Sequence, residues 1–311
     1  MAFDPAGFLV AHGLIGSSAG VLARPLAGGY WNENFRVKGP GVDWVVKHYR
    51  TRLKPTLFPN LPADEARALQ VLKGMHVAPE SVAFVEAGEG HGPVLVYRYY
   101  PGRPWVEDVG PVAELLRRQH AVETDGFRLL PSEPDEILAD ADRLPRAPED
   151  DPLWREAQAR RPQPGEVPRL ERRVLVHTDV GPGNLIVGAQ GVRLIDWQCP
   201  GLGDPAEDLW TFLSAAILIL YQHPGLGPKE AARFVDAYGD PETRARLDFL
   251  APYFAYRLAA YCCFRRYQLC GPGDEAARDR YERAARAQID ALPPPDSGGA
   301  RLKPSPSATP S

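Results

Sequence analysis

The segment from Val174 to Trp197 constrains the fold more than any other part of the 311-residue chain. It reads VLVHTDVGPGNLIVGAQGVRLIDW, so short apolar runs alternate with polar residues. Short apolar runs bounded by Gly, Asn and Asp are typical of buried strands joined by turns. The segment therefore predicts a small hairpin-like structure whose polar residues gather at strand ends and in the loop between strands.

Three polar side chains in this segment suit phosphoryl transfer. Asp179 and Asn184 enclose the turn VGPG, and Asp196 follows the last apolar run. Oxygen donors at this spacing supply ligands for a hard cation such as Mg²⁺ and one carboxylate that orients a hydroxyl. Each residue alone is more often a turn-forming Asx residue, so the prediction depends on the whole set.

The N-terminal part of the chain has the pattern of a sheet. Its β-branched and aromatic runs, separated by Gly and Pro turns, predict strands at residues 22–26, 34–38, 44–49, 81–86 and 94–99. One helix is predicted at 62–73, with Asp64 and Glu65 in its first turn, where the helix dipole favours acidic residues. This part is therefore expected to form a small antiparallel β lobe with one helix.

Beyond the segment YRYYPGRPW, helical patterns dominate. Helices are predicted at 110–121, 208–221, 229–238, 243–269 and 274–292, the fourth with a break near Pro252. Prolines at positions 145, 148, 152, 162, 164 and 168 interrupt residues 133–169, so this segment predicts only brief helices in a connecting or lid-like insert. The last residues, 293–311, are rich in Pro, Ser, Gly and Ala and predict a disordered tail.

HTDVGPGN (177–184) and IDWQCPGLGDPAEDLW (195–210), together with this order of elements, resemble the aminoglycoside phosphotransferase and choline kinase family. The resemblance implies an α+β, bilobal, protein-kinase-like fold. The N-terminal lobe would span residues 1–98 and bind nucleotide phosphates, and the hinge would span 99–104. The C-terminal lobe, with the catalytic segment and the acceptor site, would span 105–292.

The resemblance also implies roles for individual residues. Asp179 would accept or orient the proton of the substrate hydroxyl, and Asn184 and Asp196 would hold Mg²⁺. His177 would brace the loop. Asp204 and Asp208 would anchor the loop through hydrogen bonds.

The loop departs from the family pattern at one position. Thr178 stands where many relatives have Gly. A β-branched residue is compatible with an extended backbone at this position, so the assignment of the loop stands.

Phosphate-binding groups are expected in the N-terminal lobe. Gly28 and Gly29 would let the backbone approach phosphate oxygens closely, and Asn32 adds a polar group nearby, although Gly-Gly pairs are also common in simple turns. Lys47 lies in an apolar strand pattern, so an inward-facing ammonium requires an anionic partner, and the alternative is a lysine at a solvent-facing strand edge.

Glu65 is the candidate partner for Lys47, and together they would aim the lysine at the α- and β-phosphates. Asp64 is adjacent and competes for this role, because the register of a predicted helix is uncertain by a residue or two. Tyr99, in the connector VYRYYPG, is the candidate for contact with the adenine of ATP, against the alternative of an ordinary exit strand.

Composition excludes several other classes. The net charge of −4 leaves no global basic field for nucleic acid or an anionic membrane. The longest apolar stretch, near residues 212–221, is about half of the roughly 20 residues that a spanning helix needs. The N-terminus lacks the pattern of a signal peptide. We therefore expect a cytoplasmic protein without nucleic-acid or membrane partners, and leave its oligomeric state open.

The predicted activity is ATP- and Mg²⁺-dependent transfer of the γ-phosphate to a hydroxyl of a small molecule, and the expected acceptor bears an amine in the manner of choline, thiamine or an amino sugar. The aromatic run between Tyr253 and Tyr267 would suit an ammonium group, although such a run on a helix is more typical of a core. Two alternatives stay open: a kinase that modifies aminoglycosides, and a nucleotide-binding pseudokinase or regulatory module.

Overall fold

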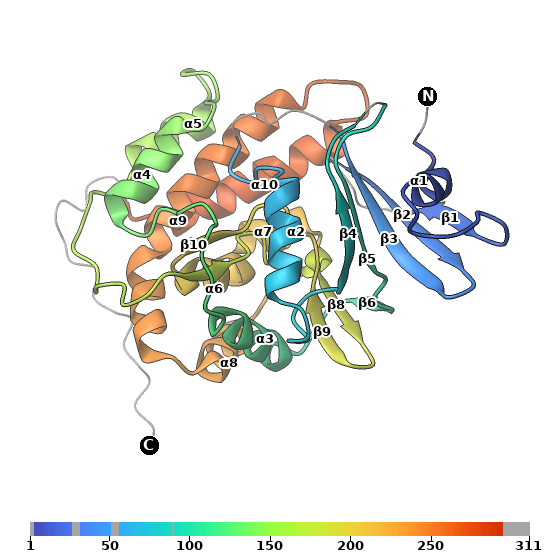
Figure 1. The fold of residues 1–311 in the computed structure, drawn as a ribbon. Helices are drawn as coiled ribbons and strands as arrows, with labels where there is room; N and C mark the ends of the chain where they lie inside the picture. Colours follow the sequence, from blue (N-terminus) through green and yellow to red (C-terminus); the bar gives the residue numbers. More distant parts are fainter. Residues whose placement is uncertain (1–2, 27–31, 51–55, 89, 295–311) are drawn as a thin grey trace. The chain divides into compact units, whose positions relative to one another are not determined.

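The computed structural model describes residues 3–26, 32–50, 56–88 and 90–294, and the chain divides into two compact units (Figure 1). Unit 1 comprises residues 1–54, 58–105 and 183–200. Unit 2 comprises residues 55–57, 106–182 and 201–311. Residues 183–200, which follow the predicted hinge in sequence, thus belong to the same unit as the N-terminal strands.

The main sheet of unit 1 has five antiparallel strands among the described residues, in the order β1-β2-β3-β5-β4. The strands are β1 (Leu22–Pro25), β2 (Asn32–Gly39), β3 (Val42–Tyr49), β4 (Ser81–Val85) and β5 (Val94–Arg98). They lie where the β-branched runs predict them. Side chains alternate between the faces of a strand, so one face of β2, β3 and β5 is apolar and forms the core of the unit.

A short helix covers part of this core. Helix α1 (Pro5–Ala11) buries Phe8 and Leu9 against valines of the sheet. It starts at Asp4, whose carboxylate accepts hydrogen bonds from the backbone N–H groups of Ala6 and Gly7. The sequence analysis did not predict α1, because seven residues are too few to show a clear helical period.

A second helix and a second sheet complete unit 1. Helix α2 (Pro62–Val71) contacts β4 and β5 (Figure 1). The second sheet has the order β6-β8-β9, formed by β6 (Gly102–Pro104), β8 (Leu185–Gly188) and β9 (Gly191–Leu194). The predicted hairpin is therefore real for β8 and β9, and β6, which was not predicted, extends it.

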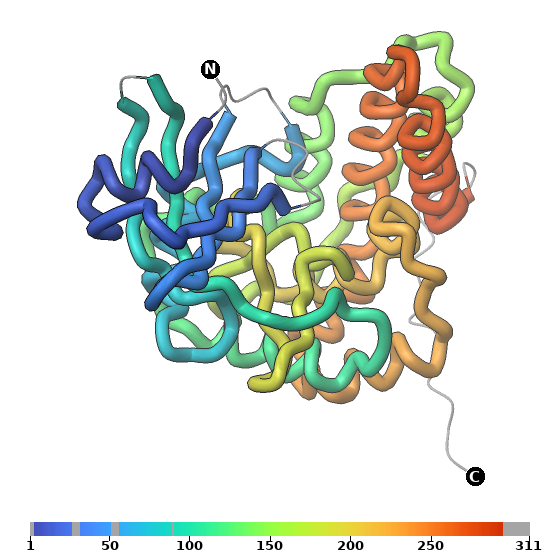
Figure 2. The backbone as a smooth tube through the Cα atoms, turned by 90° about the vertical axis from the view of Figure 1, so that its right-hand side faces the viewer, coloured from blue at the N-terminus to red at the C-terminus, as the bar shows by residue number. Residues whose placement is uncertain are grey.

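Unit 2 is mainly helical. Its helices are α3 (Gly110–His120), α4 (Pro134–Arg143), α5 (Pro152–Ala159), α6 (Pro205–Leu213), α7 (Ala215–Leu220), α8 (Pro228–Tyr238), α9 (Pro241–Gln268) and α10 (Glu275–Ala291). Helices α9 and α10 lie side by side (Figures 1 and 2). Strand β7 (Val174–Val176) pairs with β10 (Gly201–Gly203) rather than with β8. The predicted α+β class is confirmed.

The prediction of one helix over 208–221 was wrong. The chain forms α6 and α7 instead, separated by Ser214 in an extended conformation. The Ser214 hydroxyl accepts the N–H of Ile217 and receives a hydrogen bond from Gln288 of α10 at 3.1 Å. A serine that caps the next helix stabilises such a break, because it replaces backbone hydrogen bonds that the break removes.

The predicted break near Pro252 was also wrong. Helix α9 continues through this proline. Proline removes one hydrogen bond to the carbonyl four residues earlier. That carbonyl belongs to Asp248, which lies on the exposed side of the helix, where water can replace the lost donor. Burial of the opposite side against α4 and α6 supports both halves of the helix.

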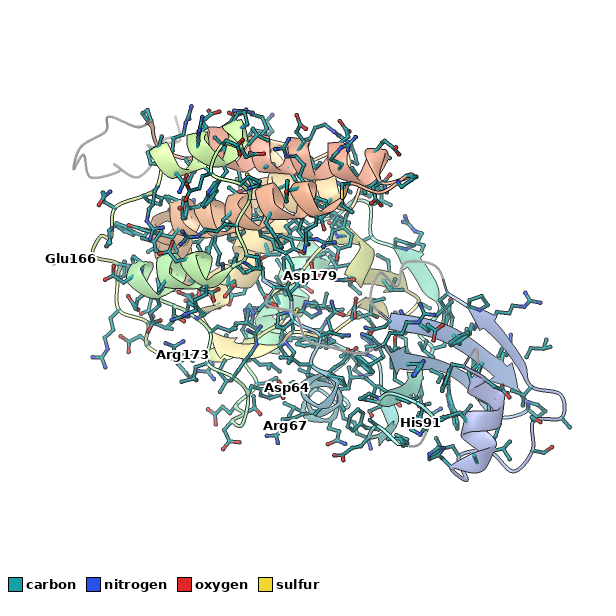
Figure 3. All side chains as sticks on the ribbon, turned by 90° about the horizontal axis from the view of Figure 1, so that it is seen from above. Asp64, Arg67, His91, Glu166, Arg173 and Asp179 are labelled. Carbon is teal, nitrogen blue, oxygen red and sulfur yellow. The ribbon has the colours of Figure 1, made fainter. Side chains whose placement is uncertain are left out.

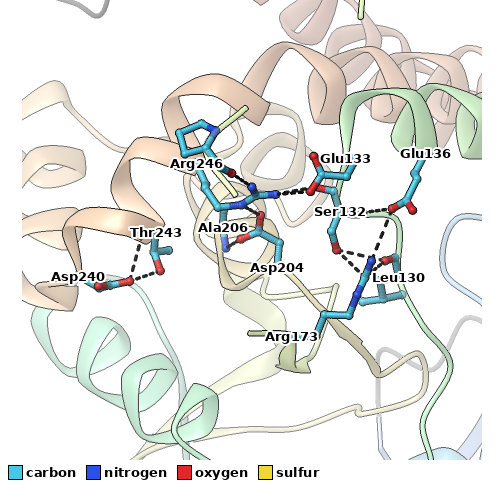
Figure 4. A network of polar contacts seen from close by, with 11 residues as sticks. Leu130, Ser132, Glu133, Glu136, Arg173, Asp204, Ala206, Asp240, Thr243 and Arg246 are labelled. Atoms are coloured by element: carbon cyan, nitrogen blue, oxygen red, sulfur yellow. Dashed lines mark hydrogen bonds and ion pairs between the residues drawn. The ribbon is translucent and has the colours of Figure 1, made fainter. Parts of the chain in front are cut away.

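The Pro-rich segment 133–169 forms only the two short helices α4 and α5, as predicted. Arg246 of α9 forms hydrogen bonds with the chain at both ends of this Pro-rich segment. Its guanidinium donates to the carbonyl of Ser132 at 2.6 Å and to the carbonyl of Pro168, and its Nε donates to Asp204 at 2.5 Å (Figure 4). None of the helices in the described ranges is long and apolar enough to cross a membrane.

Candidate active site

A buried ion cluster lies in unit 1. Lys47 occupies β3, between β2 and β5, and only 1% of it is exposed. Its ammonium contacts the Glu65 carboxylate at 2.6 Å and the carboxylate of Asp196. The hydroxyl of Tyr49 donates to Glu65 at 2.5 Å. The structure thus brings together the strand lysine, the helix glutamate and the aspartate of the IDW segment.

The electrostatics of this cluster keep Lys47 charged. Burial alone would lower the pKa of Lys47, but the carboxylates of Asp196 and Glu65 outweigh that penalty and raise its pKa. Two carboxylates face one ammonium, so the cluster carries a negative excess. The Asp196 side chain is 36% exposed, whereas those of Lys47 and Glu65 are almost fully buried. Asp196 is therefore the member that a ligand can reach.

The structure selects Glu65 rather than Asp64 as the partner of Lys47. Glu65 is buried, whereas Asp64 is partly exposed and Arg67 is exposed on the same helix (Figure 3). Residues one apart on a helix point about 100° from each other, so only one of the two acidic residues can face the sheet.

Asn184 and Asp196 lie at the open end of the β8–β9 hairpin. The register pairs Leu185 with Leu194, and the Ile195 N–H donates to the Asn184 carbonyl at 2.8 Å. Asp196 has φ of +63°, a left-handed conformation that aspartate tolerates better than most residues. The tight hairpin brings two oxygen-bearing side chains, twelve positions apart in sequence, to one end of the sheet.

The other predicted groups of unit 1 have varied surroundings. Asn32 is buried, exchanges hydrogen bonds with Asn60 and donates to Gln198. Tyr99 packs its ring under the Arg36 guanidinium, 3.7 Å from the ring centroid, and its N–H donates to the Asp43 carbonyl. That N–H is therefore already used within the unit. Gly28 and Gly29 lie outside the described residues.

In unit 2 the carboxylate of Asp208 organises the loop after β7. It is fully buried and accepts the backbone N–H groups of His177 at 2.9 Å and Thr178 at 2.8 Å. It also contacts Gln119 Nε2 at 2.7 Å and His120 Nε2 at 3.1 Å. Burial by itself would raise the pKa of Asp208, but the hydrogen bonds from His120 and the His177 backbone lower it.

The backbone at Thr178 is not extended. Its φ is +71°, in the left-handed region that β-branched residues rarely adopt. The reason is tertiary, because the two consecutive N–H groups that Asp208 accepts hold the loop in this conformation. The strained threonine explains why glycine suits this position in a loop of the same pattern.

Asp179 is partly buried directly after this turn (Figure 3). Its N–H donates to Nδ1 of His177 at 3.2 Å, and its carboxylate accepts the hydroxyl of Tyr221 at 3.1 Å. His177 is fully buried. Nδ1 of the imidazole thus accepts a hydrogen bond from the loop backbone, which suits bracing.

Asp204 anchors α6 and the insert. Its carboxylate accepts the Ala206 N–H at 2.8 Å as the N-cap of α6, and it pairs with Arg246 (Figure 4). The Asp204 carboxylate thus binds the start of α6 and Arg246, whereas Asp208 is the carboxylate that accepts the backbone N–H groups of the loop.

The sequence analysis did not single out four residues of this region. Gln119 and His120 end α3 and bind Asp208, the Tyr238 hydroxyl contacts His120 at 3.0 Å, and Tyr221 binds Asp179. The only sequence signal was that two polar residues, Gln119 and His120, interrupt the end of an amphipathic helix. Their partner in the sequence is almost ninety residues away.

The aromatic run of α9 serves mainly as core. Tyr253, Phe254, Tyr256 and Tyr261 are buried, whereas Tyr267 is 59% exposed. Arg257 pairs with the buried Glu207. These residues pack unit 2 together, which is the more usual role of such a run.

Residues 23–250 match the phosphotransferase enzyme family. The chain belongs to this family. It is a small-molecule phosphotransferase whose acceptor is an alcohol group. The chain is also 31% identical over 249 residues to viomycin phosphotransferase of Streptomyces vinaceus, covering 71% of this chain and 82% of that protein.

Solved structures confirm the kinase-like fold of this phosphotransferase. A choline/ethanolamine kinase family protein from Mesorhizobium loti has a TM-score of 0.59 at 17% identity, covering 92% of this chain and 97% of that one. A spectinomycin phosphotransferase with ADP and spectinomycin has a TM-score of 0.58 at 14% identity, covering 87% and 93%. A thermostable mutant of an aminoglycoside phosphotransferase, in a ternary complex with AMP-PNP and hygromycin B, has a TM-score of 0.60 at 18% identity, covering 92% of this chain and 99% of that one.

Proposed function

We propose that this phosphotransferase uses ATP and Mg²⁺ and transfers the γ-phosphate to a hydroxyl of a small, amine-bearing molecule. The cluster of Lys47, Glu65 and Asp196 carries the proposal. A buried ammonium kept charged by two carboxylates suits the binding of nucleotide phosphates, which it can contact as a point charge. Adenine-nucleotide complexes among structures of the same fold support ATP as the donor.

The chemical step needs one proton acceptor on the protein. The acceptor hydroxyl attacks the γ-phosphorus, an O–P bond forms, and the bond from the γ-phosphorus to the β–γ bridging oxygen breaks. ADP leaves with that electron pair, and the hydroxyl proton passes to the carboxylate of Asp179. The backbone around Asp179 is fixed by Asp208 and His177, which reduces the entropic cost of reaching the reactive geometry.

The residues at the hairpin end fit a magnesium ion. Asn184 and Asp196 offer an amide oxygen and a carboxylate, and Mg²⁺ is commonly held by one or two carboxylates together with substrate phosphates. Bound there, the ion would neutralise charge on the phosphate oxygens. Asp196 would contact the ion, and Lys47 would hold Asp196 in place.

A direct test is ADP release from Mg·ATP by purified protein across a panel of amino alcohols, thiamine-like alcohols, amino sugars and aminoglycosides. Asp179→Asn should lower acceptor-stimulated release by about 10² to 10⁴-fold, the usual contribution of a general base. Its affinity for AMP-PNP should stay within about twofold of wild type. The matched control is Asp248→Asn, an exposed aspartate on α9. Loss of AMP-PNP binding in Asp179→Asn would contradict the proposed role.

A second candidate is a kinase that modifies an antibiotic. The observation that favours it is the 31% identity to viomycin phosphotransferase. Viomycin therefore joins the panel together with hygromycin B and spectinomycin. Turnover of one of these at a submillimolar KM, with little turnover of amino alcohols, would select this candidate. The opposite pattern would select a metabolite kinase.

A further inference from the structure

Tyr221 is the side chain of unit 2 whose hydroxyl reaches the proposed general base. It ends α7, and its hydroxyl donates to Asp179 Oδ2 at 3.1 Å. The two residues are 42 positions apart in sequence, so tertiary structure brings them together. No motif of the sequence points to this tyrosine.

The end of α7 places Tyr221 by a specific backbone turn. The N–H of Gln222 donates to Ile219 at 3.0 Å, and the N–H of His223 donates to Leu218 at 2.8 Å. This is the hydrogen-bond pattern of a Schellman motif, whose left-handed position is usually glycine. Here Gln222 occupies it, with φ of +58°. His223 Nε2 also contacts the carbonyl of Val106 at 2.9 Å.

The loop after β7, which carries Asp179, leaves space for the ring of Tyr221 at Gly181. A Cβ at Gly181 would lie 2.1 Å from Cε2 of the ring, closer than any real contact allows. The ring therefore packs directly on the loop backbone, and the Gly181 N–H donates to the Asp179 carbonyl at 2.9 Å. Gly181, which leaves room for the ring, and the left-handed helix end at Gln222 together hold the Tyr221 hydroxyl against the Asp179 carboxylate.

We propose that Tyr221 is a positioning residue for phosphoryl transfer. Its O–H donates to Asp179 and holds the carboxylate in the orientation from which it accepts the proton of the substrate hydroxyl. The tyrosine keeps its own proton throughout. This inference rests on the proposed role of Asp179. A hydrogen bond to a charged group in a partly buried site favours one rotamer of that group over others.

Tyr221→Phe is the decisive variant, because it removes the hydroxyl and keeps the ring that fills the space at Gly181. With Mg·ATP and the best acceptor of the panel, kcat should fall about 10- to 100-fold, as expected for a lost hydrogen bond to a charged group. The KM values for ATP and acceptor should stay within about twofold. Tyr267→Phe, which removes the hydroxyl of an exposed tyrosine on α9, should behave as wild type.

A double-mutant cycle separates positioning from structural support. If Tyr221 acts through the Asp179 carboxylate, Tyr221→Phe should cost less than about twofold in kcat when Asp179 is already Asn. A full loss in that background would overturn the inference. So would an unchanged kcat in the single variant, or a rise in the acceptor KM alone, which would make Tyr221 a binding residue.

The outcome for the wild-type protein separates the two proposals. If the wild-type protein releases no ADP from Mg·ATP, either with water alone or with any acceptor of the panel, the proposed function fails and the positioning role of Tyr221 fails with it. If wild type turns over and Tyr221→Phe matches it, the proposed function stands and only this inference is overturned.

Discussion

The Lys47 cluster of unit 1 and the Asp208 cluster of unit 2 both bury charge, but they do so in opposite ways. Lys47 faces two carboxylates, one of which, Asp196, is more than a third exposed. Asp208 is fully buried and accepts hydrogen bonds from side-chain donors at the end of α3 and from backbone donors in the loop after β7. One cluster has an excess of negative charge and an accessible member, and the other is closed.

This difference separates binding from positioning. A cluster with an exposed carboxylate can exchange its partners when a cation or a phosphate arrives, so it suits ligand binding. A carboxylate surrounded by fixed donors cannot rearrange without losing several hydrogen bonds, so it suits holding a loop in one conformation. Substitutions in the first cluster should mainly change affinity, and those in the second should mainly change stability and turnover.

The largest effect is expected from Asp208→Asn, which breaks the closed cluster. The amide presents two donors to a site built of donors, so the variant should lose about 3 to 5 kcal/mol of unfolding free energy and most of its turnover. Urea unfolding at pH 7 measures the first quantity. Asp248→Asn is the exposed control. A loss below 1 kcal/mol would contradict the organising role of Asp208.

The same carboxylate predicts a pH dependence. The folded-state pKa of Asp208 lies below its ordinary value of 3.8, so its stabilising contribution is complete above that value. It is lost as the pH falls through the folded-state pKa. The stability difference between wild type and Asp208→Asn should therefore shrink below about pH 4. A difference that stays constant down to pH 2.5 would contradict this assignment.

Lys47→Met tests the cluster of Lys47, Glu65 and Asp196, in which Asp196 is accessible. It should weaken AMP-PNP binding at least about tenfold, because a charged contact with phosphate is lost, and calorimetry measures this change.

The same variant should also change how stability depends on pH. Burial raises the pKa of Glu65, and Lys47 opposes that rise. In Lys47→Met, the free energy of unfolding should be highest at low pH, where Glu65 is protonated, and should fall as the pH rises from 5 to 8. Lys38→Met, at an exposed strand position, is the control. Equal destabilisation at both pH values would refute this interpretation.

Arg246→Lys tests whether a second buried cluster of unit 2, which holds the ends of the segment 133–169, behaves like the Asp208 cluster. Lysine keeps the charge but cannot reach Asp204, Ser132 and Pro168 together. We expect a loss of about 2 kcal/mol and faster proteolysis within residues 133–169, with unchanged AMP-PNP affinity. Arg244→Lys, an exposed residue of the same helix, should change neither property. Slower proteolysis or weaker AMP-PNP binding would argue against this role.

The smallest effect is expected from Thr178→Gly, which removes backbone strain from the closed cluster. A left-handed conformation costs a non-glycine residue roughly 1 to 2 kcal/mol, and the added freedom of glycine in the unfolded chain offsets part of the gain. A net stabilisation of up to about 1 kcal/mol with retained turnover should result. Thr178→Ala, which keeps the strain, should not be stabilised. Stabilisation of both variants would show that strain is not the cause.

The spacing of apolar and β-branched residues predicted the strands and helices whose formation depends mainly on local sequence. The five strands of the main sheet followed from alternating and β-branched runs, and the helices followed from their period, many of them beginning with proline. Errors arose where distant contacts decided. Ser214 ends one helix and begins another partly because Gln288 of α10 binds it, and α9 continues through Pro252 because both of its halves pack on other helices.

The amino-acid sequence by itself determined the chemical composition of the candidate site: a strand lysine, acidic residues at the start of a helix, and Asp, Asn and Asp at strand ends. Motif spacing carries this information, because a tight turn or a strand end places residues only a few positions apart. Only the tertiary structure decided that Glu65 rather than Asp64 faces Lys47, that Thr178 is strained, and that Tyr221 reaches Asp179. These contacts join residues far apart in the chain, and their geometry depends on packing that no local period records.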